Sequence, residues 1–187
     1  PTQVAGFSDV MSNDIFALSV PWAVENGIAK PSSKTTFSPN EPCTRGQVLT
    51  YIYRWNDSPK SSIKNPFKDV KSSDTFYNAA LWAYEKGLFK GNTLNGNSPC
   101  TRGDTIEFLW KYANSYPMNP ADNFTDVPRS SKYHSAVSWA YWMRVATGIT
   151  PTTFEPESAC TKAQVVTFIY NLEHSHFMDW IKMASEY

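Results

Sequence analysis

The chain has 187 residues, 17 Lys and Arg against 17 Asp and Glu, and an aromatic content of 15%. Because the charges balance and form no basic stripe, we expect no nucleic-acid binding. No apolar run reaches the ~18 residues that a membrane-spanning helix needs, so we expect no membrane insertion. No signal peptide is recognisable and the chain begins at Pro1, which fits a mature secreted protein or an excised piece of a longer one.

Three short motifs recur in the same order along the chain. Phe-x-Asp-Val occupies 7–10, 67–70 and 124–127, Trp-Ala occupies 22–23, 82–83 and 139–140, and Cys-Thr-Arg or Cys-Thr-Lys occupies 43–45, 100–102 and 160–162. A fixed order of motifs at a period of about 60 residues indicates one structural unit used three times. Each unit is too small to bury a good core alone. We therefore expect a single module over 1–187, with repeats at 7–55, 67–113 and 124–172.

Each repeat predicts a helix, a connector and a second helix. In the middle repeat Phe76, Ala80 and Ala83 follow the spacing of an amphipathic helix. The equivalent stripe of the first repeat contains Pro21, which should kink or interrupt that helix. Pro, Gly, Ser, Asn and Thr are abundant in the connectors, which predicts loops at 31–42, 91–99 and 148–159.

The second helix of each repeat has a clear start signal. Residues 44–47 and 161–164 form Thr-x-x-Gln capping boxes, and residues 101–104 form a weaker version that ends in Asp. The apolar face behind these signals is broader than the face of the first helix. We expect the second helices to carry most of the shared core, and three helical hairpins to close around a common axis.

One cysteine in each repeat lies directly before the capping Thr: Cys43, Cys100 and Cys160. An apolar side chain at that position can pack on the fourth helical residue, so we favour a buried structural role. The alternative is a metal site of three thiolates on the common axis, for which single cysteines about 60 residues apart are weak evidence. We expect neither a metal nor a cofactor.

Each repeat also carries a Trp beside the apolar stripe of its first helix: Trp22, Trp82 and Trp139. Each Trp lies about 240° round the helix from the first aromatic residue of the stripe, so it flanks the stripe. We favour contact with the neighbouring repeat. The alternative is a wall on which a sugar ring stacks at the edge of a groove.

The motifs together, Phe-x-Asp-Val, Trp-Ala with a nearby Gly, and Thr-Arg-x-Gln before an apolar helix, resemble the S-layer homology domain in three tandem copies. The resemblance implies an all-α fold, in which three helix-loop-helix repeats form a pseudo-threefold, three-pronged spindle around a central helical bundle. It also implies grooves between repeats and non-covalent attachment of a secreted bacterial protein to the cell wall. The expected ligand is a secondary cell-wall polysaccharide, often pyruvylated and therefore anionic.

The resemblance also implies ligand-binding residues. The Thr-Arg-Ala-Glu motif of the family falls on Arg45, Arg102 and Lys162, at helix starts where free backbone N–H groups would favour an anion. Lys162 loses the two-pronged hydrogen bonding of Arg, so we expect unequal grooves in which Arg45 and Arg102 bind best. The loops beside the grooves carry Gly91 and Gly148, whereas the first repeat has Pro there.

The acidic position of the Phe-x-Asp-Val motif falls on Asp9, Asp69 and Asp126. These carboxylates could accept sugar hydroxyls or orient the Arg side chains. For the three Asp alone we favour a role in a turn or a cap. A second alternative is an internal Arg–Asp ion pair that ties each helix start to the preceding turn.

Residues 174–187 lie outside the repeats and have helical spacing at Phe177, Trp180, Ile181 and Ala184, which predicts a C-terminal helical extension. No catalytic motif occurs, so we do not expect an enzyme. The sequence predicts a monomeric wall anchor located at the cell surface. The main alternative is a protein-interaction scaffold of the same fold that has lost glycan binding, and a third is a wall hydrolase.

Overall fold

The computed structural model describes residues 1–117, 122–176, 178, 179 and 183, and this part of the chain is mostly helical. Its helices are α1 Ser19–Glu25, α2 Arg45–Trp55, α3 Tyr77–Glu85, α4 Arg102–Tyr112, α5 His134–Trp142 and α6 Lys162–Glu173. A short antiparallel hairpin, β1 Gln3–Val4 and β2 Phe7–Met11, precedes them and was not predicted. The residues on which the predicted C-terminal helix depends, Phe177, Trp180, Ile181 and Ala184, lie outside the described residues.

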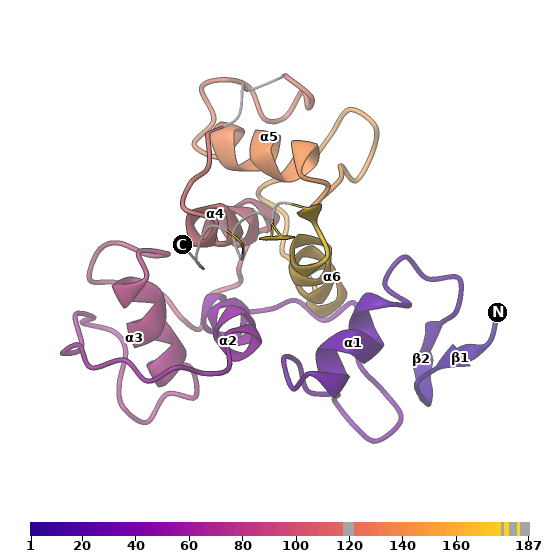
Figure 1. The fold of residues 1–187 in the computed structure, drawn as a ribbon, viewed down its shortest axis with the longest axis horizontal. Coiled ribbons are helices and arrows are strands. Elements are labelled where there is room, and N and C mark those ends of the chain that lie inside the picture. The colour runs from indigo at the N-terminus through magenta and orange to yellow at the C-terminus, as the bar shows by residue number, and fades with distance from the viewer. Residues whose placement is uncertain (118–121, 177, 180–182, 184–187) are drawn as a thin grey trace.

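The second helices of the three repeats, α2, α4 and α6, lie at the centre of the molecule, and α6 contacts both of the others (Figure 1). Each first helix packs on the second helix of a different repeat: α3 on α2, α5 on α4 and α1 on α6. The expectation of a hairpin within each repeat is therefore wrong. The N-terminal helix α1 packs on the C-terminal helix α6, which closes the three repeats into a ring.

Helix α1 begins at Ser19, so Pro21 is the third residue of the helix. The N–H that proline lacks is one of the four that have no partner within a helix, and its loss costs little there. Pro21 therefore belongs to the first turn and does not interrupt the helix. The result is a helix of 7 residues, against 9 in α3 and in α5.

The three cysteines meet at the centre of the ring through their backbones. The Cys43 N–H donates to the Cys160 carbonyl (2.9 Å), Cys100 to Cys43 (2.9 Å) and Cys160 to Cys100 (2.8 Å), so each repeat is bonded to both others. Their side chains are buried, as expected. Burial raises the pKa of each thiol to about 12, which keeps the thiols protonated at neutral pH. Within the described residues, no three His, Cys, Asp or Glu side chains lie where they could hold a metal ion.

The predicted capping boxes are present at α2 and α6, where Thr44 pairs with Gln47 and Thr161 with Gln164. At α4 the Thr101 side chain accepts the Asp104 N–H. The first two amides of each central helix also have partners, because they donate to the connector of another repeat. These bonds are Arg45 to Ser98, Gly46 to Gly96, Arg102 to Ser158, Gly103 to Pro156, Lys162 to Glu41 and Ala163 to Pro39. The expectation of free N–H groups for an anion is therefore wrong.

Candidate functional site

The cation of each repeated motif reaches into the connector of the next repeat round the ring. Arg102 is 3% exposed and donates from Nε to the Phe154 carbonyl (3.0 Å) and from a terminal nitrogen to the Thr147 carbonyl (3.1 Å). Lys162 Nζ donates to the Phe37 carbonyl (2.6 Å). Arg45 Nε donates to the Leu94 carbonyl (2.9 Å). All three predicted cations thus bind backbone oxygens between repeats.

The aspartate of each Phe-x-Asp-Val motif braces the connector of its own repeat. Asp69 accepts the N–H groups of Leu94 (2.9 Å) and Asn95 (2.7 Å). The same pattern joins Asp9 to Phe37 and Ser38, and Asp126 to Phe154 and Glu155. One connector residue in each repeat therefore binds its own Asp through its N–H and a neighbouring cation through its carbonyl. The acid and the cation bind the backbone of one shared residue instead of forming a direct ion pair.

Two of the three predicted Trp rings have no surface to offer a sugar. Trp82 and Trp139 are 2% and 0% exposed, because they are packed in the core between repeats. The stacking alternative is therefore wrong for these two residues. Trp22 is partly exposed, and its ring meets Tyr170 edge-on at a centroid distance of 5.4 Å.

The two predicted glycines have backbone roles. Gly91 has a φ of 105°, a conformation that favours glycine. A Cβ on Gly148 would lie 2.6 Å from both the Thr153 carbonyl oxygen and the Phe124 ring, so this turn needs a residue without a side chain. Gly148 also lines one of the grooves described next.

A hollow of about 240 Å³ lies where Lys162 of the third repeat meets α2 of the first; we name it the Lys162 groove. Lys30, Arg54 and Lys162 line it, and among the residues that the structure describes there Glu41 is the one acid. The Glu41 carboxylate lies 4.0 Å from Lys162 Nζ, which is a loose contact. The remaining wall is polar, from Gln47, Thr50, Tyr51 and Thr75.

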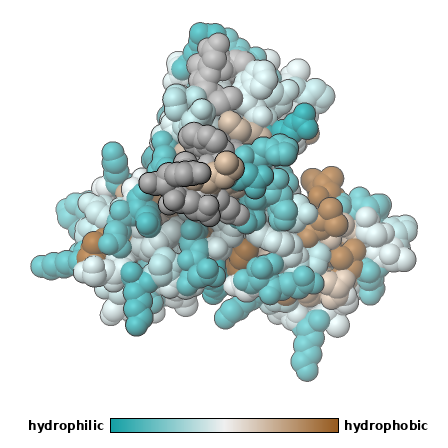
Figure 2. Space-filling view, in the orientation of Figure 1, coloured by the Kyte–Doolittle hydropathy of each residue, from teal (hydrophilic) through white to brown (hydrophobic). Residues whose placement is uncertain are grey.

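The equivalent hollow beside Arg102, the Arg102 groove, is smaller and mostly apolar. Its volume is about 120 Å³, and Ile15, Phe16, Val145 and Ile149 are among its lining residues. Ile15 is 92% exposed, and the neighbouring Leu18 is 71% exposed. Figure 2 shows a mostly hydrophilic face, with a large hydrophobic area over the arm that carries α1. The Arg102 groove offers little charge to an anion.

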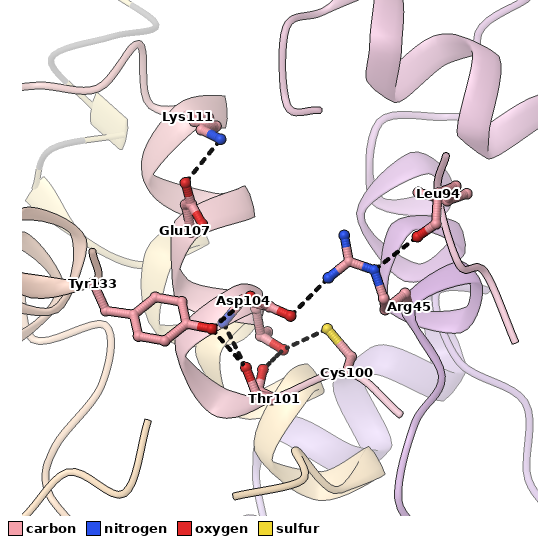
Figure 3. Close-up of polar contacts among 9 residues, drawn as sticks. Arg45, Leu94, Cys100, Thr101, Asp104, Glu107, Lys111 and Tyr133 are labelled. Carbon is pink, nitrogen blue, oxygen red and sulfur yellow. Dashed lines mark hydrogen bonds and ion pairs between the residues drawn. The ribbon is translucent and has the colours of Figure 1, made fainter. Parts of the chain in front are cut away.

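The third equivalent place, beside Arg45, is occupied by ion pairs. Arg45 contacts the Asp104 carboxylate at 2.6 Å, and Asp104 also accepts the Tyr133 hydroxyl at 2.8 Å (Figure 3). Lys111 pairs with Glu107 at 2.9 Å. Asp104 stands where the other two repeats have Gln47 and Gln164. The acid at this motif position therefore neutralises Arg45, one of the two Arg side chains expected to bind best.

Sequence reasoning missed Lys30 and Arg54, because neither belongs to a repeated motif. A signal for Arg54 existed: Gln47, Thr50, Tyr51 and Arg54 follow the helical spacing i, i+3, i+4, i+7. All four line the Lys162 groove. Lys30 directly precedes the connector at 31–42, and only the tertiary fold brings it to this helix.

Models of the S-layer homology domain match residues 6–49, 66–106 and 123–166, which is most of the chain. The chain belongs to this family. It is 25% identical over 153 residues to an amylopullulanase of Thermoanaerobacterium thermosulfurigenes, 24% over 153 residues to the exoglucanase XynX of Acetivibrio thermocellus, and 28% over 176 residues to an endoglucanase of Bacillus sp. strain KSM-635.

These alignments cover 78%, 78% and 89% of this chain but only 8%, 14% and 18% of the relatives. The similarity to the three named enzymes is therefore confined to a small part of each of them. The family is a binding and anchoring module. None of the helices in the described ranges has the length and apolar character needed to span a membrane.

Proposed function

We propose that this S-layer homology module anchors a secreted protein non-covalently to the bacterial cell wall. It does so as a non-catalytic monomer at the cell surface, by binding an anionic and pyruvylated secondary wall polysaccharide. Its three repeats, 7–55, 67–113 and 124–172, take the three-pronged spindle arrangement of the family. Family membership supports the attachment role, and so do the relatives' names, which are those of polysaccharide-degrading enzymes.

The observation that carries the proposal is the charge of the Lys162 groove. Lys30, Arg54 and Lys162 line one hollow, and Glu41 is the single acid among its described lining residues. Lys30 is exposed and Arg54 is half-buried, so both can reach an acidic sugar substituent. A guanidinium such as that of Arg54 can form two parallel hydrogen bonds to one carboxylate. The groove therefore suits a carboxylated saccharide.

The same reasoning reverses the ranking expected from the motif. Beside Arg45, Asp104 holds Arg45 and Glu107 holds Lys111. Arg102 and Lys162 are both buried and bonded to backbone carbonyls, so the motif cations do not distinguish these two grooves. The difference lies in Lys30 and Arg54, which line the Lys162 groove. We propose that the Lys162 groove binds the polysaccharide best, although the motif residue there is Lys and the other two repeats have Arg.

Co-sedimentation with purified walls of the source organism tests the function. The chain should bind intact walls and lose binding after hydrofluoric acid removes the secondary polysaccharide. Lys30→Ala should weaken binding roughly two- to fivefold, the effect of one partly solvated charge. Lys90→Ala is the matched control, because Lys90 is the exposed Lys at the equivalent place in the second repeat.

Three outcomes separate the proposals. Undiminished binding to stripped walls rejects the polysaccharide as the ligand. Equal losses from Lys30→Ala and Lys90→Ala reject the ranking of the grooves. Absence of binding to intact walls favours the scaffold alternative, for which the apolar Arg102 groove and the exposed Ile15 and Leu18 are the supporting observations.

A further inference from the structure

A cavity of about 450 Å³ lies at the C-terminal ends of α1, α2, α4 and α6; we name it the end cavity. None of the residues proposed for the Lys162 groove lines it except Arg54. Its wall is partly aromatic, from Trp22, Trp55 and Tyr112. The rest is mainly polar, from Asn26, Arg54, Asn56, Asp57, Glu173 and His174. It is larger than the Lys162 groove and has a different chemistry.

The aromatic rings of the end cavity are held in place by their polar atoms. Trp55 Nε1 donates to the Glu173 carboxylate (3.0 Å), and the Tyr112 hydroxyl donates to the Asn56 side-chain oxygen (2.9 Å). The Trp55 and Tyr112 rings lie 4.9 Å apart at an interplanar angle of 46°. Both rings are half-buried, so part of each remains accessible. Rings fixed in this way lose little conformational entropy when a ligand stacks on them.

This aromatic pair occurs once in the ring of repeats. Trp55 and Tyr112 are the last residues of α2 and α4, and Leu172 occupies the equivalent position of α6. Trp22 on α1 is the partly exposed member of the repeated Trp residues, and its ring lies 5.7 Å from that of His174. These three partly exposed rings therefore line one cavity, which shares Arg54 with the Lys162 groove.

The polar groups of the end cavity suit hydroxyls better than a single charge. Arg54 brings one positive charge, whereas Asp57 and Glu173 bring two negative ones. The Asp57 carboxylate is exposed and makes no hydrogen bond to any other described residue. Asn26 uses its amide nitrogen on the Trp22 carbonyl (2.8 Å), which leaves its side-chain oxygen as an acceptor. Planar acceptors around aromatic faces match a ring with C–H faces and hydroxyl edges.

We propose that the end cavity is a second subsite, which holds an uncharged pyranose residue of the wall polysaccharide. Arg54 lines both the end cavity and the Lys162 groove. One polymer chain therefore places an acidic sugar in the Lys162 groove and an uncharged sugar in the end cavity, and passes across the Arg54 side chain between them. This inference rests on the proposed function. Trp55 provides the stacking surface, and Asn26 and Asp57 accept sugar hydroxyls.

Fragments of two lengths separate the two subsites. The probe is the polysaccharide released from walls by hydrofluoric acid, divided into fragments of one repeating unit and fragments of several units. Binding is measured by isothermal titration calorimetry. Trp55→Ala should weaken the long fragments roughly three- to tenfold, the effect of one aromatic contact. It should leave the short fragments unchanged, because these fill only the Lys162 groove.

Two controls keep the test specific. Trp110→Ala removes a half-buried Trp of the central helix α4 that does not line the end cavity, and it should change neither affinity. Trp55→Phe keeps an aromatic ring at the site, so this variant should retain most of the affinity for the long fragments. It provides a test even if Trp55→Ala folds poorly. Lys30→Ala should weaken both lengths equally.

Equal affinities of Trp55→Ala and the unmodified chain for the long fragments overturn the second subsite and leave the Lys162 groove intact. Equal losses for both lengths from Trp55→Ala, with recovery in neither from Trp55→Phe, also overturn it. Absence of binding to either length by the unmodified chain rejects the proposed function and the subsite together. A loss confined to the long fragments supports the subsite.

Discussion

Replacement of Arg102 by Met tests whether this side chain holds the repeats together or binds the ligand. The guanidinium is 3% exposed, donates to two carbonyls, and lies 4.5 Å from the centre of the Phe154 ring. Each hydrogen bond from a charged donor contributes about 1.5–3 kcal/mol, and a desolvated cation–π contact about 2 kcal/mol. Relief from burying a charge offsets part of this sum. We expect a net loss of about 2–4 kcal/mol in the free energy of unfolding.

Urea denaturation followed by circular dichroism measures this loss, and the melting temperature should fall by roughly 5–15 °C for a chain of this length. Arg45→Met is the matched comparison. Arg45 makes one carbonyl bond and one ion pair, and its side chain is 16% exposed, so the loss should be about half as large. If Arg102→Met unfolds within about 0.5 kcal/mol of the parent and has lost its affinity for wall polysaccharide, Arg102 is a binding residue and the structural reasoning fails.

Two further predictions concern stability. A Cβ on Gly46 would lie 2.5 Å from the Phe76 ring, whose far edge is packed against Gly96. Gly46→Ala should therefore destabilise the chain by about 1–2 kcal/mol in urea, because overpacking outweighs the helix-propensity gain of about 1 kcal/mol; a stabilised variant contradicts this. The three buried cysteines have a folded pKa of about 12 against an ordinary value of 9.0. The stability that these protonated thiols contribute is complete below pH 9 and is lost as the pH rises towards about 12. The free energy of unfolding should therefore fall by up to about 4 kcal/mol per pH unit in this range. A triple Cys→Ala variant should lack this fall. A free energy of unfolding that stays constant from about pH 9 to 11 contradicts this role of the thiols.

Local signals predicted the helix starts, because a capping box is complete within four residues. Thr44 with Gln47 and Thr161 with Gln164 take the roles that their spacing indicates. The weaker motif ending in Asp104 has the single capping bond that its composition suggested. The repeat period also predicted three equivalent units. These features depend on residues close together in sequence, so they can be read from a single chain.

The pairing of helices and the partners of the motif cations could not be predicted in the same way. The carbonyl that Arg102 binds at Phe154 is 52 residues away, and the one that Lys162 binds at Phe37 is 125 residues away. A periodic sequence does not state whether a first helix packs within its own repeat or on another. Both arrangements bury the same apolar stripes, and only the contacts between helices in the folded chain distinguish them.

The fate of the motif cations explains why binding should depend on positions that the repeats do not share. Each cation binds a connector carbonyl of the next repeat, and the Asp of that repeat holds the N–H of the same residue. A ligand that displaced a cation would loosen the interface that forms its own groove. The positions equivalent to Arg54 of α2 are Lys111, which is paired with Glu107, and Asn171, which is uncharged. Repetition therefore builds the ring, and differences among the repeats decide which groove can hold an acidic sugar.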